Sequence, residues 1–500
     1  MREPGYRFEP TAGAGDVART FAHLEPGEES GVKVVVAGRL MRSRPQGKLA
    51  FGELWDWTGN IQLFALSALT PEFDEYCRLS LGDWIGVAGE VVRTRRGELS
   101  VKVASWELLA RARRGFGDKW HGVNDPDIRY RQRELDLWAN DGVRDIFLMR
   151  SRVVASIRRR LSAAGFVEVE TPVLHPIAGG ATARPFVTHY NALHTDVYLR
   201  IATELYLKRC VVGGLERVFE IGRTFRNEGL SPRHNPEFTM LELYQAYADY
   251  TDMMAIFEDI VGGTAEELFG KTVLPYQGRE IDLTPPWRRA TLVELIAEHA
   301  GVELDLEMGV ERLQAIAADL GVPFEPWYGP GKLILEIYEK TTEAELWGPI
   351  FVCDYPQEVS PLARAHRSKP GWVERFEPII AGRELGNAFS ELVDPDDQRA
   401  RFEDQERERA LGDDEAMSID WDYLRALELG LPPTGGLGLG IDRLVMLYAD
   451  VANIREVVLF PALRPEDKPP ESQAGTTEPQ AGTTESQAGT TEPQAGTPEP

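Results

Sequence analysis

The sequence predicts an α+β protein in which an N-terminal five-stranded barrel precedes a larger domain built on an antiparallel sheet. Two observations support this fold class. Five short strand-like segments, with one helical segment after the third, occupy residues 32–110, which is the pattern of an OB-fold barrel. Farther along, paired strands within 218–247 and four later strands are flanked by helical stretches. Their order favours an antiparallel sheet over a parallel βαβ sheet.

Length and composition exclude several classes of protein. The 500 residues provide room for two or three domains, and a hydrophobic content of 43% is typical of a globular protein. The sequence has no run of 18 apolar residues and no signal-like start, so we expect a cytosolic protein without a membrane span. Cys77, Cys210 and Cys353 are far apart, which predicts inert core thiols rather than a metal or redox site.

Charge is distributed unevenly along the chain. The net charge of −25 argues against nucleic acid as a partner, because phosphate contacts need local positive charge. Residues 32–120, however, hold 14 Lys and Arg against 10 Asp and Glu, a balance of +4. The predicted barrel is therefore a basic segment of an acidic chain. This pattern fits either a nucleic-acid surface or a solvated basic surface without a ligand.

The elements of the N-terminal part follow from its turn residues and alternating segments. Residues 1–31 are rich in Gly, Pro and Glu and predict an extension with one short helix near Asp16–Leu24. The OB-fold domain is assigned to 32–118, with a helical piece near Pro71–Leu79. Its expected strands are 32–41, 48–57, 60–66, 84–92 and 98–109. Residues 119–142 carry many charges and few apolar positions, which indicates a linker to the next domain.

The large domain is assigned to residues 143–464. Apolar residues at helical spacing predict a helix over Val143–Ala164, followed by a strand at Val167–Thr171. Further helices are expected at Ala202–Val212 and Thr251–Phe269, and a mainly helical insert at about 285–345. Four later strands are expected at 350–355, 373–381, 384–392 and 437–440.

The last segment of the chain, residues 465–500, changes character. It holds 7 acidic residues and 1 lysine, a balance of −6. Residues 473–500 consist of four seven-residue copies of QAGTTEP or close variants, with no apolar side chain larger than alanine. Such a repeat cannot form the seam of a coiled coil, so we predict a disordered low-complexity tail.

The stretch from Val218 to Tyr247 carries the densest set of candidate binding residues. Period-two alternation groups its polar and aromatic side chains on one face of two strands: Glu220, Gly222, Thr224, Arg226, Phe238, Met240, Glu242 and Tyr244. An arginine can hold a phosphate or carboxylate with two parallel hydrogen bonds, and an aromatic ring can stack on a purine. A carboxylate beside a tyrosine can hold an ammonium group. From these residues alone, a nucleotide-and-amine site and a surface hairpin with ordinary ion pairs both remain open.

Three blocks of the large domain resemble the three motifs of the class II aminoacyl-tRNA synthetases, in the form found in bacterial lysyl-tRNA synthetases. GFVEVETPVL at 165–174 is similar to motif 1. TFRNEG and RHNPEFTMLELY, within 224–244, are similar to motif 2, and GLGLGIDRLVML at 436–447 is similar to motif 3. Further lysyl-type segments are GGATARPFVTHYNAL, TELYLKR and GRELGNAFSELVDP at 179–193, 203–209 and 382–395. The resemblance covers nearly the whole chain except its two ends.

This resemblance implies an enzyme that ligates L-lysine to tRNA(Lys) through a lysyl-adenylate intermediate, with ATP as a substrate and Mg²⁺ as cofactor. It also implies a homodimer, formed by the helix and strand of motif 1. One alternative is a paralogue that delivers lysine to a non-tRNA acceptor, which the barrel argues against. Another is a non-catalytic RNA-binding paralogue, which would be expected to have lost Arg226, Glu384 or Arg443.

The resemblance assigns Arg226 and Arg443 as catalytic residues, the first between the lysine carboxylate and the α-phosphate and the second on the γ-phosphate. The implied ATP-binding residues are Arg226, Glu228, His234, Asn235, Phe238, Glu377, Asn387 and Arg443. The implied metal ligands are Glu377 and Glu384, on either side of an expected turn at Ala381–Gly382. Strict alternation puts Glu384 on the face opposite to Asn387, so we predict a β-bulge near Gly386.

The lysine pocket implied by the resemblance is rich in glutamate, which suits a cationic substrate. Its expected residues are Gly180, Glu204, Arg226, Glu242, Tyr244, Asn387, Phe389 and Glu391. Among them, Glu391 with Tyr244 is expected to hold the ε-ammonium group, and Glu204 with Gly180 the α-amino group. The related aspartyl and asparaginyl enzymes should need basic or neutral groups at these carboxylates.

In the barrel, the resemblance implies that the anticodon is read by Phe51, Gln62 and Glu98. Taken singly, these residues would also fit a core ring, a surface amide and a turn carboxylate. Trp55 and Trp57 are bulkier than the family pattern on this strand, and they either pack the barrel or alter the anticodon pocket. The basic N-terminal helix with which bacterial members often begin is missing from the expected elements.

Overall fold

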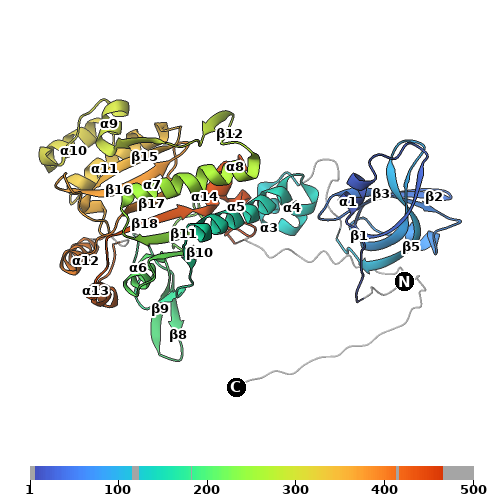
Figure 1. Cartoon of the computed structure of the whole chain (residues 1–500), viewed down its shortest axis with the longest axis horizontal. Coiled ribbons are helices and arrows are strands. Elements are labelled where there is room, and N and C mark those ends of the chain that lie inside the picture. Colours follow the sequence, from blue (N-terminus) through green and yellow to red (C-terminus); the bar gives the residue numbers. More distant parts are fainter. Residues whose placement is uncertain (1–5, 115–122, 182, 411, 413–415, 466–500) are drawn as a thin grey trace, which may run out of the picture. The chain divides into compact units, whose positions relative to one another are not determined.

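The computed structural model describes residues 6–114, 123–181, 183–410, 412 and 416–465 (Figure 1). The repeats of the expected tail and residues 119–122 of the expected linker lie outside these residues. No helix in the described part of the chain is long and apolar enough to cross a membrane.

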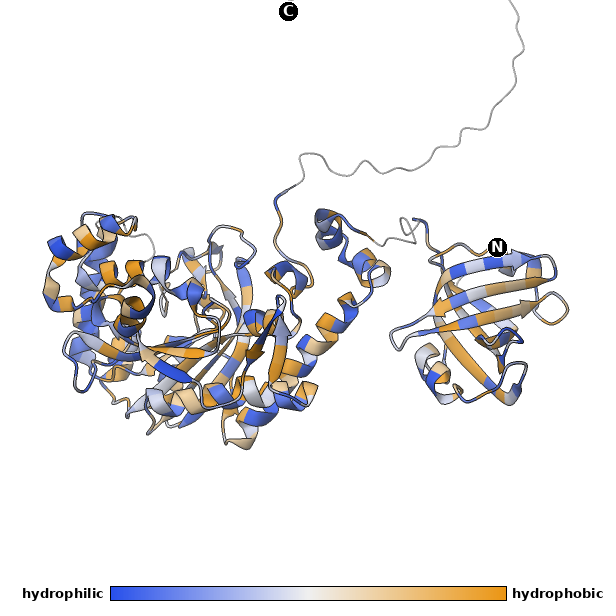
Figure 2. Cartoon of the chain, turned by 90° about the horizontal axis from the view of Figure 1, so that it is seen from above, coloured by the Kyte–Doolittle hydropathy of each residue, from blue (hydrophilic) through white to orange (hydrophobic). Residues whose placement is uncertain are grey.

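The N-terminal strands close into a barrel, which confirms the OB-fold prediction. The strands β1 (Glu29–Gln46), β2 (Leu49–Trp55), β3 (Asn60–Leu66), β4 (Trp84–Arg93) and β5 (Leu99–Ala110) follow the closed order β1-β2-β3-β5-β4. Helix α1 (Ala14–Thr20) precedes them, and the short α2 (Phe73–Tyr76) lies between β3 and β4. Alternate strand residues such as Leu54, Leu63 and Val101 are fully buried and form the core. Apolar residues are prominent on the barrel strands in Figure 2.

The charged segment between the two domains contains two short helices, α3 (Pro126–Arg131) and α4 (Arg133–Ala139). Arg133 is fully buried, yet its charge is matched by Asp136, and its guanidinium also donates to the backbone carbonyls of Arg455 and Leu459 at 2.6 and 2.9 Å. The segment is therefore ordered by ion pairs and hydrogen bonds rather than by apolar burial, which is why apolar spacing gave no sign of these helices.

The large domain is built on an eight-stranded sheet of order β14-β15-β16-β17-β18-β11-β10-β6. The strands are β6 (Val167–Glu168), β10 (Arg217–Phe225), β11 (Glu237–Ala246), β14 (Arg288–Thr291), β15 (Ile350–Pro356), β16 (Trp372–Ile379), β17 (Gly386–Ser390) and β18 (Thr434–Gly440). Only the two edge pairs, β6 with β10 and β14 with β15, are parallel, whereas the five inner pairs are antiparallel. The expected α+β class with an antiparallel sheet is confirmed.

The two faces of this sheet differ in their side chains, as the alternation of β10 and β11 predicts: one is apolar, and the other also carries polar residues. Phe219, Leu241 and Leu243 point into a core shared with helices α5 (Val143–Ala163), α7 (Tyr250–Glu258), α8 (Thr264–Phe269) and α14 (Ile441–Tyr448). On the other face, Val218 and Tyr244 belong to a second core that includes α6 (Glu204–Val212) and α13 (Trp421–Leu427). The polar residues of β11 also lie on this second face.

The chain also forms a small sheet, a hairpin and further helices in addition to the large sheet (Figure 1). A small sheet has the order β7-β9-β8, with β7 (Leu174–His175), β8 (Val187–Tyr190) and β9 (Thr195–Leu199). Strands β12 (Val273–Tyr276) and β13 (Arg279–Asp282) form a hairpin. The insert contains α9 (Leu292–Ala300), α10 (Val310–Asp319) and α11 (Pro330–Thr341), and α12 (Pro395–Ala410) follows β17.

Three sequence expectations differ from the structure in detail. The strand expected at 167–171 pairs as a strand only at Val167–Glu168, because the amide of Thr171 donates to the Glu220 carboxylate at 3.0 Å instead of to a neighbouring strand. The helix expected at 251–269 contains a π-helical turn at Asp259–Gly263. The mainly helical insert also contributes the edge strand β14 to the large sheet.

The cysteines differ in burial from the sequence expectation. Only Cys353 is buried, whereas Cys77 and Cys210 are half-buried, so the expectation of three core thiols is wrong for two of them. Burial raises the pKa of each thiol, to about 12 at Cys353. All three are therefore weak nucleophiles at neutral pH.

Candidate active site

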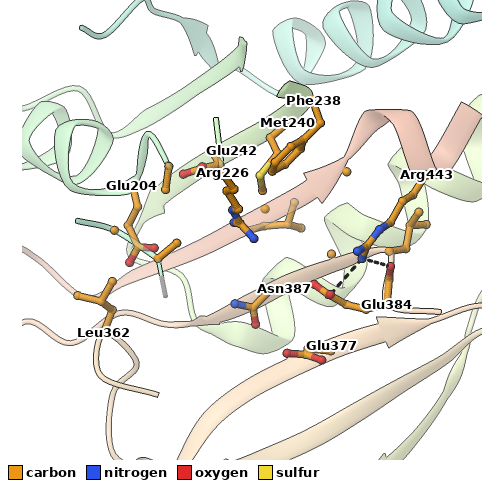
Figure 3. A pocket seen from close by; sticks show the side chains of 18 of the residues that line it. Glu204, Arg226, Phe238, Met240, Glu242, Leu362, Glu377, Glu384, Asn387 and Arg443 are labelled. Carbon is orange, nitrogen blue, oxygen red and sulfur yellow. Dashed lines mark hydrogen bonds and ion pairs between the residues drawn. The ribbon is translucent and has the colours of Figure 1, made fainter. Parts of the chain in front are cut away.

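One cavity of about 410 Å³ opens on the second face of the large sheet and is lined by both Arg226 and Arg443. The pairing of β10 with β11 places Gly222 opposite Met240 and Thr224 opposite Phe238, so polar and aromatic groups share this face. Figure 3 shows the arrangement: Glu204 lies toward one end of the cavity, Arg443 with Glu384 lies at the other, and Arg226 and Asn387 lie between them. Candidate residues far apart in the sequence are thus brought together.

Arg226 stands where strand β10 ends. Its backbone amide donates to the carbonyl of Pro236 at 2.9 Å, which ties it to the start of β11. Its guanidinium carbon lies 5.2 Å from the centre of the Phe238 ring, and its buried Nε has no hydrogen-bond partner among the described residues. A fixed guanidinium with unused donors can accept a phosphate or a carboxylate.

At the other end of the cavity, Arg443 is the third residue of helix α14. Its Nη1 donates to the backbone carbonyl of Glu384 at 2.6 Å and to the carboxylate of Glu384 at 3.0 Å. The preceding strand β18 is rich in glycine, so Gly436, Gly438 and Gly440 line the cavity without side chains of their own. A flat surface between two arginines can accommodate a polyphosphate.

The loop between β10 and β11 supplies three further candidate residues. Glu228 and His234 are exposed at the rim, and the His234 ring nitrogen Nδ1 lies 2.8 Å from the Ser231 hydroxyl. Neighbouring groups still partly desolvate the ring, and this, together with the nearby Arg443, lowers the pKa of His234, which favours the neutral ring at pH 7. Asn235 is buried; its amide donates to the carbonyl of Glu237 at 2.6 Å and accepts from the amide of Ala462 at 3.1 Å. Asn235 therefore fixes the loop, and its expected contact with a nucleotide stays a prediction.

The predicted β-bulge near Gly386 is present. Phe376 pairs with Ala388, and Ile379 bridges to Glu384, so two residues of β16 are opposite three residues at the start of β17. The extra residue turns Glu384 toward the cavity, on the same side as Asn387. Without it, alternation would point Glu384 away from the site.

Glu377 and Glu384 are the candidate metal ligands. Burial raises the pKa of Glu377 to about 7, and the negative charge of Glu384 adds to this increase. Arg375 opposes the increase through an ion pair with Glu377 at 2.6 Å. Two neighbouring carboxylates whose charges repel one another suit a divalent cation. No group of three or more His, Cys, Asp and Glu side chains with metal-binding geometry exists within the described ranges. A pair of carboxylates completed by phosphate oxygens fits Mg²⁺, which rarely has an all-protein cage.

The amino-acid end of the cavity is strongly acidic. Glu242 is buried on β11, where its carboxylate accepts from the Thr203 amide at 3.0 Å and lies 3.4 Å from the Tyr244 hydroxyl. Burial raises the pKa of Glu242 to about 7. Glu204 begins helix α6, and Gly180, with a φ of +89°, lines the cavity next to it.

Glu391 is fully buried and is not among the residues that line the cavity; the structure places it next to Tyr244 and Gly436, which do line this end. The Glu391 and Tyr244 side chains both pack against Gly436, since a Cβ atom added to this glycine would collide with both of them. Glu391 Oε1 has no hydrogen-bond partner in the described part of the chain, whereas Oε2 forms an ion pair with Lys208. A buried carboxylate oxygen without a partner is unfavourable unless a ligand cation completes it.

Asn387 and Phe389 complete this wall of the cavity from strand β17. Asn387 Oδ1 accepts from Arg375 Nε at 2.9 Å, and the same guanidinium is paired with Glu377 and packed 4.5 Å from the centre of the Tyr355 ring. Arg375 thus holds Asn387, in the middle of the cavity, and Glu377, a candidate metal ligand.

Arg375 and Lys208 were not among the site residues expected from the sequence, although Arg375 lines the cavity and Lys208 contacts Glu204. For Lys208 a signal existed, because it follows Glu204 by four residues on a predicted helix and is therefore within ion-pair reach. For Arg375 no comparable pattern exists, since its partners come from other strands.

The three candidate anticodon residues share the outer side of the barrel. Phe51 of β2 is opposite Phe64 of β3, and the two rings are stacked with centres 5.3 Å apart. Gln62, on β3, donates to the Ser100 hydroxyl at 2.8 Å, and Glu98 is exposed just before β5. Trp57 has 77% of its surface exposed, so it does not pack the barrel core. Trp55 is half-buried on β2.

Known proteins share both parts of this architecture. Residues 125–464 match the family described as tRNA synthetases class II (D, K and N), and residues 34–109 match the OB-fold nucleic acid binding domain. The lysine–tRNA ligase of Moorella thermoacetica is 51% identical over 466 residues, covering 93% of this chain and 94% of the relative. That of Clostridium perfringens is 49% identical, covering 92% of each chain. That of Synechococcus sp. strain CC9311 is 53% identical over 468 residues, covering 92% of this chain and 95% of the relative.

Proposed function

The chain belongs to the class II tRNA synthetases of the D, K and N group, and from this we propose that it ligates L-lysine to tRNA(Lys) with ATP. Within this group, the amino-acid pocket decides the substrate. The observation that supports lysine as the substrate is the pair of buried carboxylates Glu204 and Glu242, which line one end of the cavity, together with Glu391, buried next to Tyr244. The two paralogue alternatives have no support, since the relatives match over both domains and bear the name lysine–tRNA ligase.

The first step joins lysine to the α-phosphate. A carboxylate oxygen of lysine attacks the α-phosphorus, the bond to the bridging oxygen breaks, and pyrophosphate leaves with that electron pair. Arg226, between the two ends of the cavity, would hold the lysine carboxylate and the α-phosphate together and stabilise the charge that develops on the phosphoryl oxygens. Arg443 would hold the γ-phosphate, and Phe238 would stack on the adenine ring, with Glu228 and His234 at its edge.

In the second step, the terminal ribose hydroxyl of tRNA attacks the lysyl carbonyl and AMP leaves. Neither step requires a protein nucleophile, in keeping with the high thiol pKa values of the cysteines. Glu377 and Glu384 would hold Mg²⁺, which supplies positive charge to the phosphates when bound. The OB-fold domain would bind the anticodon through Phe51, Gln62 and Glu98, with base stacking on the aromatic ring.

We also propose a homodimer. The apolar face of α5 is used within its own domain, because Val153 and Ile157 are fully buried there. By contrast, Val167 on the edge strand β6 and Val173 and Leu174 shortly after it remain exposed by 51%, 42% and 50%. An exposed apolar edge is a typical site of association. Light scattering should give twice the mass of one chain. The proposed location is the cytoplasm, where bacteria charge tRNA.

The function is tested by lysine-dependent exchange between ATP and labelled pyrophosphate, followed by charging of a tRNA(Lys) transcript. Both activities are expected with lysine, and neither with aspartate or asparagine. Exchange without charging would favour transfer to another acceptor, and exchange with aspartate instead of lysine would contradict the assignment of the acidic pocket.

A further inference from the structure

Lys208 is a buried ammonium group directly behind the proposed lysine pocket. It lies on helix α6, its side chain is fully buried, and Nζ donates to Glu204 Oε1 at 2.6 Å and pairs with Glu391 Oε2. Three rings from different elements surround Nζ, with centres 5.4 to 5.9 Å away: Phe389, Tyr244 and Tyr423. One lysine thus connects the carboxylates proposed for the two opposite amino groups of the substrate.

The charges around Lys208 match a dicationic guest. Glu204, Glu391 and Glu242 contribute three negative charges when ionised, and Lys208 cancels one of them. Two charges remain, which equals the number of amino groups on lysine. The substrate carboxylate is served separately by Arg226. Two further cationic groups act on these carboxylates: Arg226 on Glu242, and Arg375 on Glu204, the latter already paired with Glu377.

We propose that Lys208 is a positioning and specificity-determining residue, an internal counter-cation that holds one oxygen of Glu204 and one of Glu391 and leaves the other oxygens for the substrate. This inference rests on the proposed function. Lys208 has no surface of its own in the cavity, so it acts through the two glutamates rather than by touching the substrate.

The physical basis is the cost of burying carboxylates close together. Burial raises the pKa of both Glu204 and Glu391, and Lys208 opposes this increase at each of them. Without the ammonium group, their pKa values must rise further, because Glu242 adds a like charge and Tyr244 and Tyr423 offer no positive charge. A carboxylate that takes up a proton cannot pair with an amino group of lysine. Lysine binding would then require a higher pH.

The test compares Lys208→Met, which removes the charge at similar volume, with Lys208→Arg, which keeps it. Binding of lysine to the full-length chain is measured by calorimetry from pH 6 to 9, together with exchange kinetics. In Lys208→Met, the midpoint of the binding profile should move upward by at least about one pH unit, which means roughly tenfold weaker binding at pH values well below the wild-type midpoint. Binding should recover as the pH rises, and kcat should change far less than KM. Lys208→Arg should keep the wild-type midpoint.

A matched control is Lys332→Met. Lys332 also pairs with a glutamate one helical turn away, at 2.9 Å from Glu336, but it lies outside the cavity, so its loss should leave the profile unchanged. An unshifted midpoint in Lys208→Met, with activity lowered equally at every pH, would mean a purely structural role and overturn the inference. Should that variant not fold, Lys208→Gln replaces it under the same criteria. Absence of lysine binding in the wild type would instead overturn the proposed function.

Discussion

Replacing Glu391 by glutamine removes one negative charge from the bottom of the proposed lysine pocket while keeping the size of the side chain. The position is fully buried, so solvent does not screen the interaction of this carboxylate with a bound ammonium group. Lys208 keeps Glu204 as a partner in the variant, at 2.6 Å, so the protein should still fold. The change therefore isolates the charge that Glu391 offers to the substrate.

The expected size of the effect follows from that burial. Truncating one partner of a buried, hydrogen-bonded charge pair costs about 2–5 kcal/mol. Taking about 3 kcal/mol, and about 1.4 kcal/mol for each factor of ten, the affinity for lysine should fall roughly 100-fold. ATP affinity should be unchanged, because Arg443 and Phe238 lie away from Glu391 on other strands and helices.

The assay is lysine-dependent pyrophosphate exchange, with KM determined separately for lysine and ATP. Glu428→Gln is the matched control: this exposed glutamate lies 3.7 Å from Arg399 at the surface, where an ion pair contributes about 0–1 kcal/mol. A Glu391→Gln enzyme with an unchanged KM for lysine would show that Glu391 does not face the substrate, and the pocket assignment would be wrong.

Three further changes probe the other parts of the site. Arg226→Ala should lower kcat of exchange by about 10²–10³-fold, as expected for loss of a transition-state donor; a change confined to KM would contradict this role. Glu384→Gln should raise the Mg²⁺ concentration needed for half-maximal exchange several-fold, and an unchanged Mg²⁺ titration would exclude it as a ligand. Phe51→Ala should weaken charging of tRNA by about 1–3 kcal/mol while exchange stays normal, and Trp57→Ala serves as its comparison on the same segment. Equal charging by wild type and Phe51→Ala would remove Phe51 from the anticodon site.

Local patterns predicted much of the fold and part of the site. Alternation along β10 and β11 separated Leu241 and Leu243, in the core, from Glu242 and Tyr244, at the cavity, because a strand has only two sides. The same rule exposed the conflict at Glu384 and so predicted the bulge.

Other features could not be predicted in this way because they depend on contacts between distant segments. The helices around Arg133 are held by carbonyl groups more than 300 residues away, and no local pattern records such partners. Asn235 is held by Ala462, and Lys208 becomes a buried counter-cation only when strand β17 brings Glu391 to it. The sequence motifs contain Asn235 and Lys208, but the contacts that fix these two side chains come from other segments of the chain.

The bulge at the start of β17 has a consequence for the geometry of the reaction. It lets one short segment present both Glu384 and Asn387 to the same cavity, although simple pleating would put them on opposite sides. Because both side chains belong to this one segment, a shift of the segment would displace Glu384 and Asn387 together and keep their spacing.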